Sequence, residues 1–348
     1  MQKFLKNKKC YFIADIGANH DGSLSRAKKL IRLCAKAGAN AAKFQHFKAD
    51  TIVSDIGFNK IGKLSHQKNW KISVYQTYKK ASINPKWNRS LQLECKKNKI
   101  DFLTSAYDLK YVDDVQKYIV AYKIGSGDIS WLEIIKKISE KNKPIILATG
   151  ASSLNDVKKA VKIILKKKKS LVLMQCNTNY TASDKNFKYI NLNVLKKFKS
   201  IFNSKVILGL SDHTHGHTTV LGAITLGAKV IEKHFTDDNN RKGPDHAFAM
   251  NYHTWKTMVD ESRKLEDALG DGIKKVEKNE LKTYYLQRRS IRANKDIKIN
   301  EKINKLNVIS LRPASVKGLN PEFMHKILNK KVKKSIKKGD LIILKNLK

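Results

Sequence analysis

The segment VILGLSDHTHGHTTVLGAITLGAKVIEKHFTDDNNRKGPDH, residues 206–246, decides the fold of this chain. It holds two short apolar runs, Val206–Leu210 and Ala228–Ile231. Each run leads into a polar cluster that ends in a histidine, His213 after the first and His234 after the second. Parallel barrels present reactive side chains where their buried strands end. The segment therefore predicts two neighbouring barrel strands with a chemical site at their carboxyl ends.

The same alternation extends over the first 270 residues, where short β-rich runs are separated by helix-like stretches. The helix expected at Ser23–Ala37, for example, begins on a residue that can cap it and is followed by Gly38. Strands that alternate with helices indicate βα units and a parallel sheet. A count of eight favours a closed (β/α)8 TIM barrel over an open doubly wound sheet. The eight expected strands are Tyr11–Ile16, Ala41–Gln45, Ile100–Thr104, Tyr122–Ile124, Pro144–Ala148, Leu171–Gln175, Val206–Leu210 and Ala228–His234.

Two departures from this pattern divide the chain further. The connector between Gln45 and Ile100 is far longer than a normal βα connection, so we expect either a lid over the site or a helical decoration with its own small core. The barrel pattern ends near Gly270. We therefore predict a catalytic barrel over residues 1–270, a linker over 271–287 and a small domain over 288–348. The strand-like runs of that small domain are Ser290–Ala293, Val308–Leu311 and Leu341–Leu344.

The net charge of the chain bears on which class of partner the protein binds. The 348 residues carry a formal net charge of +41, a value typical of proteins that bind nucleic acid or anionic membranes. The lysines, however, are spread over predicted helices and connectors, and arginine, the preferred reader of phosphates and bases, is scarce. We interpret the charge as a lysine-rich surface that helps to collect an anionic substrate, and we expect neither nucleic acid nor a membrane as partner.

Cysteine usage and the apolar runs indicate the compartment. The four cysteines are scattered and form no CxxC motif, which fits a reducing cytoplasm. No run of 18 apolar residues exists that could span a bilayer. The N-terminal apolar run stops at Asp15 without a small-residue cleavage site, so we read it as the first strand and not as a signal peptide. A cytoplasmic location is the expectation.

The positions directly after the predicted strands hold the candidate active residues. Lysines, hydroxyls and glycine-flanked backbone amides around one mouth suit a phosphorylated or carboxylated substrate. Two histidines at neighbouring strand ends, His213 and His234, suit a divalent metal with open coordination positions. Glu232 could orient such groups, whereas we interpret Asp237 and Asp238 as solvated charges. The full set comprises Asp15, Asn19, His20, Asp21, Lys43, Gln45, Thr104, Ser105, Lys123, Ser126, Asp128, Thr149, Gly150, Asn177, Thr178, Tyr180, Ser211, Asp212, His213, Glu232, Lys233, His234 and Asp245.

Six short motifs resemble a known family. In chain order they are IADIGANHDGSL (13–24), AAKFQHFKAD (41–50), YKIGSGDI (122–129), GLSDHT (209–214), IEKHFTDD (231–238) and GPDH (243–246). Together they resemble the sialic acid synthases, nonulosonate synthases that condense phosphoenolpyruvate with an N-acylated hexosamine. The stretches KDIKINEKINKLNVISLRP (295–313), GLNP (318–321) and KKSIKKGDLI (333–342) resemble the antifreeze-like (SAF) β-clip domain that ends those enzymes. The resemblance covers nearly the whole chain.

The resemblance implies roles for the matched residues. His213 and His234 match two metal ligands that usually serve Mn²⁺, with Mg²⁺ or Co²⁺ as alternatives. Asp128, together with Asp15, matches a carboxylate expected to act in catalysis. Arg312 matches an arginine that reaches the N-acyl group of the sugar in the partner subunit of a domain-swapped homodimer. The expected phosphoenolpyruvate-binding set is Lys43, Lys123, Ser126 and Ser211, completed by the hydroxyls of Ser105 and Thr178. The expected sugar-binding set is Asp15, Tyr180, Asp245 and Arg312.

Departures from the family pattern leave the acceptor sugar open. Asp15 and Asp128 stand where better-known members carry glutamate, so each carboxylate is one methylene shorter. The predicted fifth strand reads Ala148-Thr149-Gly150, where Ser-Thr-Gly is frequent. The candidate acceptors are N-acetylmannosamine and the bacterial diacetamido sugars.

Two alternative functions stay open at this point. The first is another phosphoenolpyruvate-dependent sugar-acid synthase of the barrel aldolase type, which would use a phosphorylated sugar. The C-terminal domain argues against it, because that domain offers a cover for a neutral acylated sugar. The second is a non-catalytic basic barrel that binds anions or nucleic acid. It predicts arginines and aromatic residues clustered on one face, and the sequence shows no such cluster.

Overall fold

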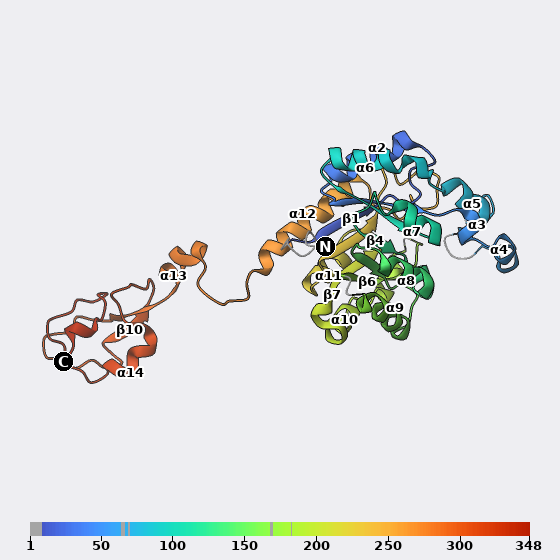
Figure 1. Cartoon of the computed structure of the whole chain (residues 1–348). Helices are drawn as coiled ribbons and strands as arrows, with labels where there is room; N and C mark the ends of the chain where they lie inside the picture. Colours follow the sequence, from blue (N-terminus) through green and yellow to red (C-terminus); the bar gives the residue numbers. More distant parts are fainter. Residues whose placement is uncertain (1–8, 64–66, 69, 168–169, 182) are drawn as a thin grey trace. The chain divides into compact units, whose positions relative to one another are not determined.

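The structure is a computed structural model that describes residues 9–63, 67–68, 70–167, 170–181 and 183–348. The chain divides into two compact units, Met1–Gly270 and Asp271–Lys348. The first unit holds a closed barrel and the second a small two-stranded sheet (Figure 1). Each unit has a hydrophobic core of its own.

Eight parallel strands close the barrel in chain order, which confirms the predicted fold class. The first strand pairs with both the second and the last, so that Asp15 lies opposite Lys43 on one side and His234 on the other. This register brings the ends of three strands together on one rim. The strands are β1 (Tyr11–Asp15), β2 (Ala41–His46), β3 (Asp101–Ala106), β4 (Tyr122–Ile124), β5 (Ile145–Ala148), β6 (Leu171–Cys176), β7 (Val206–Asp212) and β8 (Val230–His234).

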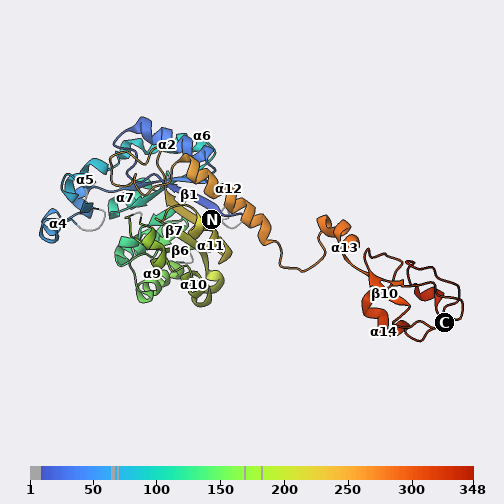
Figure 2. The same ribbon diagram turned by 180° about the vertical axis from the view of Figure 1, so that it is seen from behind.

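Helices follow the strands and surround the barrel, as Figures 1 and 2 show from two sides. The Ser23 hydroxyl caps α2 (Leu24–Lys36) by accepting the N–H of Arg26, and Gly38 follows with a φ of 92°. Ser153 opens α9 (Leu154–Lys166) with a reciprocal capping box. The other helices of the barrel repeat are α6 (Asn88–Lys97), α7 (Leu109–Val115), α8 (Leu132–Glu140), α10 (Val194–Phe202), α11 (Thr218–Thr225) and α12 (Tyr252–Leu269).

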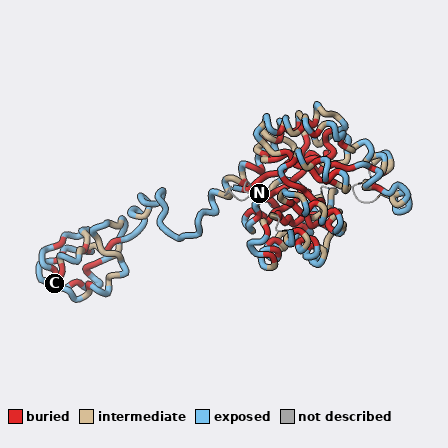
Figure 3. The backbone as a smooth tube through the Cα atoms, viewed as in Figure 1, coloured by how far each residue is buried: buried red, intermediate tan, exposed pale blue. Residues whose placement is uncertain are grey.

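Apolar side chains fill the barrel on both faces of its sheet. Ile13, Leu103, Ile146 and Met174 pack inside the barrel, and a larger cluster packs between the strands and the helices. Parallel strands that are buried on both faces read as nearly continuous apolar runs, which is why the sequence located them. Figure 3 shows buried residues concentrated in the barrel.

A helical insertion lies between β2 and α6. It contains α3 (Ala49–Ile52), α4 (Asp55–Ile61) and α5 (Val74–Ala81), followed by a short 3-10 turn, η2 (Pro85–Trp87). Aromatic rings hold its parts together. The ring centroids of Phe47 and Tyr78 are 5.3 Å apart, and those of Trp70 and Tyr78 are 6.4 Å apart. The described parts of the insertion therefore pack against one another next to β2.

The second unit contains two of its three predicted strands. β9 (Ser290–Ala293) and β10 (Val308–Leu311) pair antiparallel, over a core that includes Ile291 and Ile342. The third predicted strand, Leu341–Leu344, is wrong, because Leu341 forms only an isolated bridge and a 3-10 turn, η8 (Leu344–Asn346), follows. Ile342 is the only fully buried residue of that run. The run therefore contacts the core at one position and lacks the alternating burial of a strand in a sheet. The remaining helices are α13 (Leu281–Gln287) and α14 (Met324–Ile327).

Two further findings bear on the environment of the protein. Within the described ranges, no helix has the length and apolar composition needed to cross a bilayer. All four cysteines lie in the barrel unit, where they are buried and free.

Candidate active site

Buried lysines and carboxylates converge inside the carboxyl end of the barrel. Lys43 of β2 donates to the Asp15 carboxylate of β1, with 2.6 Å between Nζ and Oδ2. Lys123 of β4 donates to Glu232 of β8, with 2.7 Å between Nζ and Oε1. The same Glu232 oxygen accepts from the Ser211 hydroxyl of β7 at 3.3 Å and lies 3.9 Å from the Lys43 ammonium. Five strands thus contribute to one continuous charge cluster.

The charges of the cluster shift the pKa values of its members. Burial raises the pKa of Asp15, but the nearby Lys43 ammonium, together with Lys123, outweighs burial and lowers that pKa to about 2. Burial lowers the pKa of Lys43, and the carboxylates of Asp15 and Glu232 reverse this and raise it. Both partners are therefore ionised at neutral pH. The second oxygen of Glu232 is buried and has no hydrogen-bond partner among the described residues.

Hydroxyl groups and a glycine crowd the neighbouring strand ends. Ser126 begins a 3-10 turn, η3 (Ser126–Asp128), and its hydroxyl accepts the backbone N–H of Gly150 at 2.9 Å. A Cβ atom on Gly150 would lie 2.5 Å from the Thr178 methyl carbon, so only glycine fits there. Ser105 is fully buried at the end of β3. The predicted hydroxyls of β3, β4 and β6 therefore lie at the same rim as the lysines.

Asp128 stands apart from the lysine cluster, at the end of η3. It is half-buried, and burial raises the pKa of its carboxyl to about 6. The same carboxylate contributes to raising the pKa of Tyr107, after burial of that phenol. A carboxyl group with a pKa near the working pH is suited to proton transfer.

The two predicted metal ligands, His213 and His234, lie side by side. Their ring centroids are 5.5 Å apart, and the ring of Tyr180 packs 4.4 Å from that of His213. Nδ1 of His213 lies 2.8 Å from the Asn177 carbonyl oxygen, to which it can only donate. Burial lowers the pKa of His213, but hydrogen bonds to Cys176 and to the Asn177 carbonyl outweigh burial and raise it.

The second imidazole completes a donor set that fits a metal with open positions. Burial lowers the pKa of His234, which keeps the ring neutral. Its Nε2 atom lies 3.4 Å from the Asp15 carboxylate, and its buried Nδ1 has no hydrogen-bond partner in the described part of the chain. No group of three or more His, Cys, Asp or Glu side chains in the described ranges is gathered to hold an ion. A metal here would therefore take its remaining ligands from water or substrate.

A pocket of about 170 Å³ opens beside His234. Gln45, Tyr180, His234 and Asp245 line one part of it. The insertion after β2 provides much of the rest, namely Phe47, Ile52, Trp70, Thr77, Tyr78 and Ala81. The insertion is therefore a wall of the site, and not a remote decoration.

Asp245 is placed at this pocket by the loop after β1. Its Oδ2 atom accepts the N–H of Ala18 at 3.0 Å and lies 3.8 Å from Nδ1 of His234. Gly17 has a φ of 50°, and a Cβ atom there would lie 2.6 Å from the Asp245 carboxylate. A side chain at position 17 would therefore displace Asp245.

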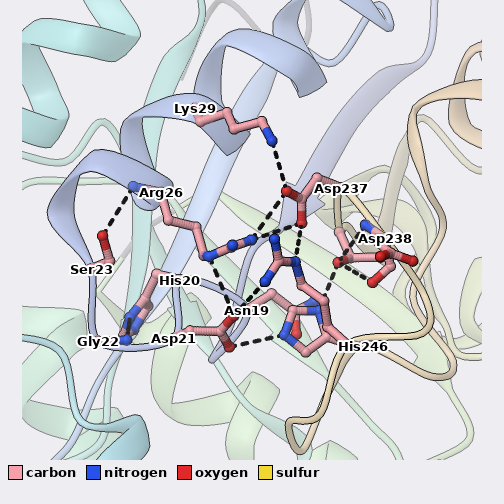
Figure 4. A network of polar contacts seen from close by, with 12 residues as sticks. Asn19, His20, Asp21, Gly22, Ser23, Arg26, Lys29, Asp237, Asp238 and His246 are labelled. Atoms are coloured by element: carbon pink, nitrogen blue, oxygen red, sulfur yellow. Dashed lines mark hydrogen bonds and ion pairs between the residues drawn. The ribbon is translucent and has the colours of Figure 1, made fainter.

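A network of ion pairs joins the loops after β1 and β8 (Figure 4). Asp237 accepts from Arg26 at 2.9 Å, from Lys29 at 3.0 Å and from Arg241 at 3.1 Å. Its side chain is only 7% exposed. The interpretation of Asp237 as a solvated charge is therefore wrong, because two of its partners come from α2, more than 200 residues away in the sequence.

His246 fixes the turn that carries Asp245. Its Nε2 atom lies 2.9 Å from the Asp21 carboxylate (Figure 4). Its Nδ1 atom lies 2.7 Å from the Thr236 hydroxyl. The ring is fully buried. A side chain on Gly243 would meet the ring at 2.6 Å, so the glycine allows the close turn. The Gly-Pro-Asp-His sequence is thus locked against both loops.

Two residues of the candidate set, Asp212 and Lys233, lie outside the barrel interior. Lys233 donates to Asp212 and to the Thr214 carbonyl oxygen, and both side chains are fully buried. Side chains alternate along a strand, and the partners on the other face of β7 and β8 are Ser211 and Glu232. The Asp212–Lys233 pair therefore braces the two strands from outside.

Arg312 lies in the other unit, at the end of β10, and is exposed.

Glu232 has a more central position than the sequence analysis gave it, because its carboxylate contacts both buried lysines. Strand periodicity could have revealed it. Val230 faces the interior of the barrel, so Glu232 and His234, two and four residues later, face it as well.

A closed barrel whose mouth gathers buried lysines, carboxylates and paired histidines defines a (β/α)8 enzyme that handles an anionic substrate. The chain belongs to the NeuB family, whose model matches residues 30–274, and a SAF domain matches residues 288–348. This confirms the resemblance to the sialic acid synthases.

The relatives agree over nearly the full length. The chain is 38% identical to the N,N'-diacetyllegionaminic acid synthase of Campylobacter jejuni, over 96% of this chain and 99% of that one. It is 33% identical to the pseudaminic acid synthase of the same organism, over 97% of each. The crystal structure of N-acetylneuraminic acid synthetase from Leptospira borgpetersenii superimposes with a TM-score of 0.68 at 26% identity, over 79% of this chain and 90% of that one.

Proposed function

We propose that this enzyme condenses phosphoenolpyruvate with an N-acylated hexosamine to give a nonulosonate and inorganic phosphate. The observation that carries the proposal is the pair of buried lysines, Lys43 and Lys123, each held by a carboxylate within 2.7 Å. Phosphoenolpyruvate bears a phosphate and a carboxylate, and two buried ammonium groups can neutralise both. The relatives, which are synthases of legionaminic and pseudaminic acid, support the same reaction.

The bond changes of the reaction define the roles of the side chains. C3 of phosphoenolpyruvate forms a bond to the aldehyde carbon of the sugar, and the aldehyde oxygen takes a proton to become a hydroxyl. Water adds to C2, and loss of inorganic phosphate leaves the ketone of the product. Lys43 and Lys123 hold the anionic ends so that C3 faces the aldehyde. Tyr180 and Asp245 lie beside His234, which supports a role for them in binding the sugar.

A divalent metal, for which we propose Mn²⁺, fits between His213 and His234. The fit rests on the two imidazole rings lying side by side, on the neutral His234 ring and on its buried Nδ1 atom, which has no hydrogen-bond partner among the described residues. When bound there, the ion would polarise the aldehyde of the acceptor. The imidazoles are adequate ligands for several divalent ions, so Mg²⁺ and Co²⁺ are expected to substitute.

We expect Asp128 to give the enzyme an acid limb in its pH profile. As the base that activates water, Asp128 must be ionised, so kcat/KM should rise with pH through about 6. In Asp128→Asn the limb should disappear, and kcat should fall by on the order of 100-fold or more. The measurement is a pH series of initial rates for both proteins.

The control for that series is Asp114→Asn, which removes an exposed carboxylate of α7 and should leave the profile unchanged. An Asp128→Asn enzyme that keeps its rate and its acid limb would remove Asp128 from the mechanism.

We further propose a cytoplasmic, domain-swapped homodimer in which Arg312 of one chain completes the site of the other. The buried free thiols support the compartment. The exposed guanidinium of Arg312 supports the swap, because an arginine fork suits the amide carbonyl of an acylated sugar. The small SAF unit is also near the size at which docking adds needed stability.

Subunit mixing tests the swap. His213→Ala and Arg312→Ala chains should each be inactive alone. In mixed swapped dimers one site receives both lesions and the other receives neither, so random exchange should restore about a quarter of wild-type activity. No recovery in proven heterodimers would mean that Arg312 acts within its own chain, and an active Arg312→Ala parent would mean that Arg312 does not act at all.

Phosphate release tests the function as a whole. Incubation with phosphoenolpyruvate and a metal should release phosphate only when an N-acylated hexosamine is added. Release with a phosphorylated aldose instead would favour the barrel aldolase alternative. Salt-dependent retention on heparin without any phosphate release would favour the binding-protein alternative.

A further inference from the structure

The turn that carries Arg312 lies beyond the paired part of its strand. The ladder between β9 and β10 ends with Leu311 opposite Ser290. Arg312 follows directly, and its exposed side chain forms no hydrogen bond or ion pair with any described residue. Surface turns are ordinarily more mobile than the strands they connect. Any rigidity of this turn must therefore come from contacts outside the ladder.

Arg292 of β9 supplies the central contact of this kind. Its Nη2 atom donates to the Pro313 carbonyl oxygen at 2.9 Å, and its Nη1 atom donates to the Gly339 carbonyl oxygen at 3.0 Å. Its Nε atom is buried and has no hydrogen-bond partner in the described part of the chain, so the guanidinium is oriented through these two carbonyl oxygens. Arg292 therefore ties the turn, one residue after Arg312, to a second loop of the same unit.

The next two N–H groups of the turn are held as well. The Ala314 N–H donates to the Tyr285 carbonyl oxygen of α13 at 2.8 Å, and the Ser315 N–H donates to the Ser290 hydroxyl at 3.1 Å. Ser290 is fully buried, so its hydroxyl is a fixed anchor. All of these contacts act on the backbone of the turn, and they leave the guanidinium of Arg312 exposed.

We propose that Arg292 is a positioning residue for the condensation, which holds the turn so that the Arg312 guanidinium meets the acceptor sugar in one orientation. The inference rests on the proposed function, in which Arg312 contacts the N-acyl group of the sugar. Such a contact tolerates little displacement of the arginine. A residue on a loop reaches that precision only when a further layer of hydrogen bonds fixes it. Arg292 provides that layer without touching the substrate, because both of its fork nitrogens bind carbonyl oxygens.

A role in stability alone predicts a different behaviour. The core of the unit is apolar and includes Ile291 and Ile342, whereas Arg292 is only half-buried. Loss of a purely structural contact would loosen the whole unit. Loss of a positioning contact would loosen the turn and leave the core intact, because proteins open locally as well as globally.

Amide hydrogen exchange on the full-length protein, followed residue by residue, separates these two roles. In Arg292→Met the N–H groups of Ala314 and Ser315 should exchange on the order of 10-fold faster, as expected when a charge-assisted bond to the same turn is lost. The N–H groups of Ile291 and Ile342, which donate to backbone carbonyl oxygens, should keep their rates. Unchanged exchange at Ala314 and Ser315 would overturn the proposal.

Steady-state kinetics test the consequence for the reaction. Arg292→Met should lower kcat/KM for the acceptor sugar by on the order of 10-fold or more, with the KM of phosphoenolpyruvate unchanged. Arg292→Lys should be intermediate, because a single ammonium cannot bridge the two carbonyl oxygens as the arginine fork does. Lys295→Met, which removes an exposed cation just after β9, is the matched control for both measurements.

Two results would contradict the positioning role. The first is a turn that exchanges faster while the kinetics of the sugar stay at the wild-type level. The second is faster exchange of the core amides in both Arg292→Met and Arg292→Lys, which would mean that Arg292 serves the stability of the unit alone.

The proposed function fails in a different way. An Arg312→Ala enzyme with full activity towards the sugar would contradict the proposed role of Arg312, whatever the exchange rates of the turn. An inactive Arg312→Ala enzyme, beside Arg292 variants that turn over the sugar as the wild type does, would leave the proposed function standing and remove Arg292 from it. If the wild type releases no phosphate with any N-acylated hexosamine, the proposed function is contradicted, and hydrogen exchange still decides whether Arg292 holds the turn.

Discussion

Replacing Lys123 with alanine should lower kcat/KM for phosphoenolpyruvate by on the order of 100-fold or more, as expected when a charge-assisted contact is lost from a dry site. The Lys123 ammonium lies 2.7 Å from Glu232 inside the barrel, and both side chains are at most 5% exposed. Removing it deletes a positive charge from the anion site and leaves the Glu232 carboxylate without its closest partner. Lys43→Ala should act in the same way through Asp15.

The substrate dependence decides the assignment of these lysines. The loss should appear in the kinetics of phosphoenolpyruvate, measured at saturating sugar, and Lys137→Ala on the surface of α8 should behave as wild type. A loss confined to the KM of the sugar would mean that the two lysines bind the sugar and not phosphoenolpyruvate. Lys123→Ala combined with Glu232→Gln separates the catalytic loss from folding, because the unpaired buried charge is then gone as well.

The second large effect concerns the histidine pair. His213→Ala or His234→Ala should abolish metal-dependent turnover while the barrel stays folded, because each removes one of the two imidazoles that lie side by side. Loss of the ion can be followed independently of activity, by titrating Mn²⁺ into the apo protein in a calorimeter. His215→Ala, an exposed histidine of the same loop, is the matched control. Wild-type activity that survives a strong chelator would contradict the metal role.

Local sequence signals predicted the barrel well, for identifiable reasons. Its strands are buried on both faces and so appear as short apolar runs, and Ser23 with Gly38 marks a helix at both ends. The site could be located because strand ends in a parallel barrel meet at one rim, which collects Asp15, Lys43 and His234.

The features that were predicted wrongly or missed have a different cause. They depend on contacts with residues that are distant in the sequence. Asp237 is adjacent to a polar turn in the sequence, yet it is covered by Arg26 and Lys29 from the far end of the chain. The run Leu341–Leu344 has the composition of a strand but only one buried residue. The sequence predicted that the insertion could cover the site, but no local pattern shows that Tyr78 lines the pocket beside His234.

The stoichiometry of the reaction shows whether phosphate release is coupled to carbon–carbon bond formation. With phosphoenolpyruvate, Mn²⁺ and a neutral diacetamido hexose, phosphate release and nonulosonate formation should be measured in the same samples, the first by a colorimetric assay and the second by mass spectrometry. The account predicts one phosphate for each nine-carbon keto acid, with neither product formed when either substrate is omitted. Phosphate released without the carbon–carbon product, or no phosphate with any N-acylated hexosamine, would contradict it.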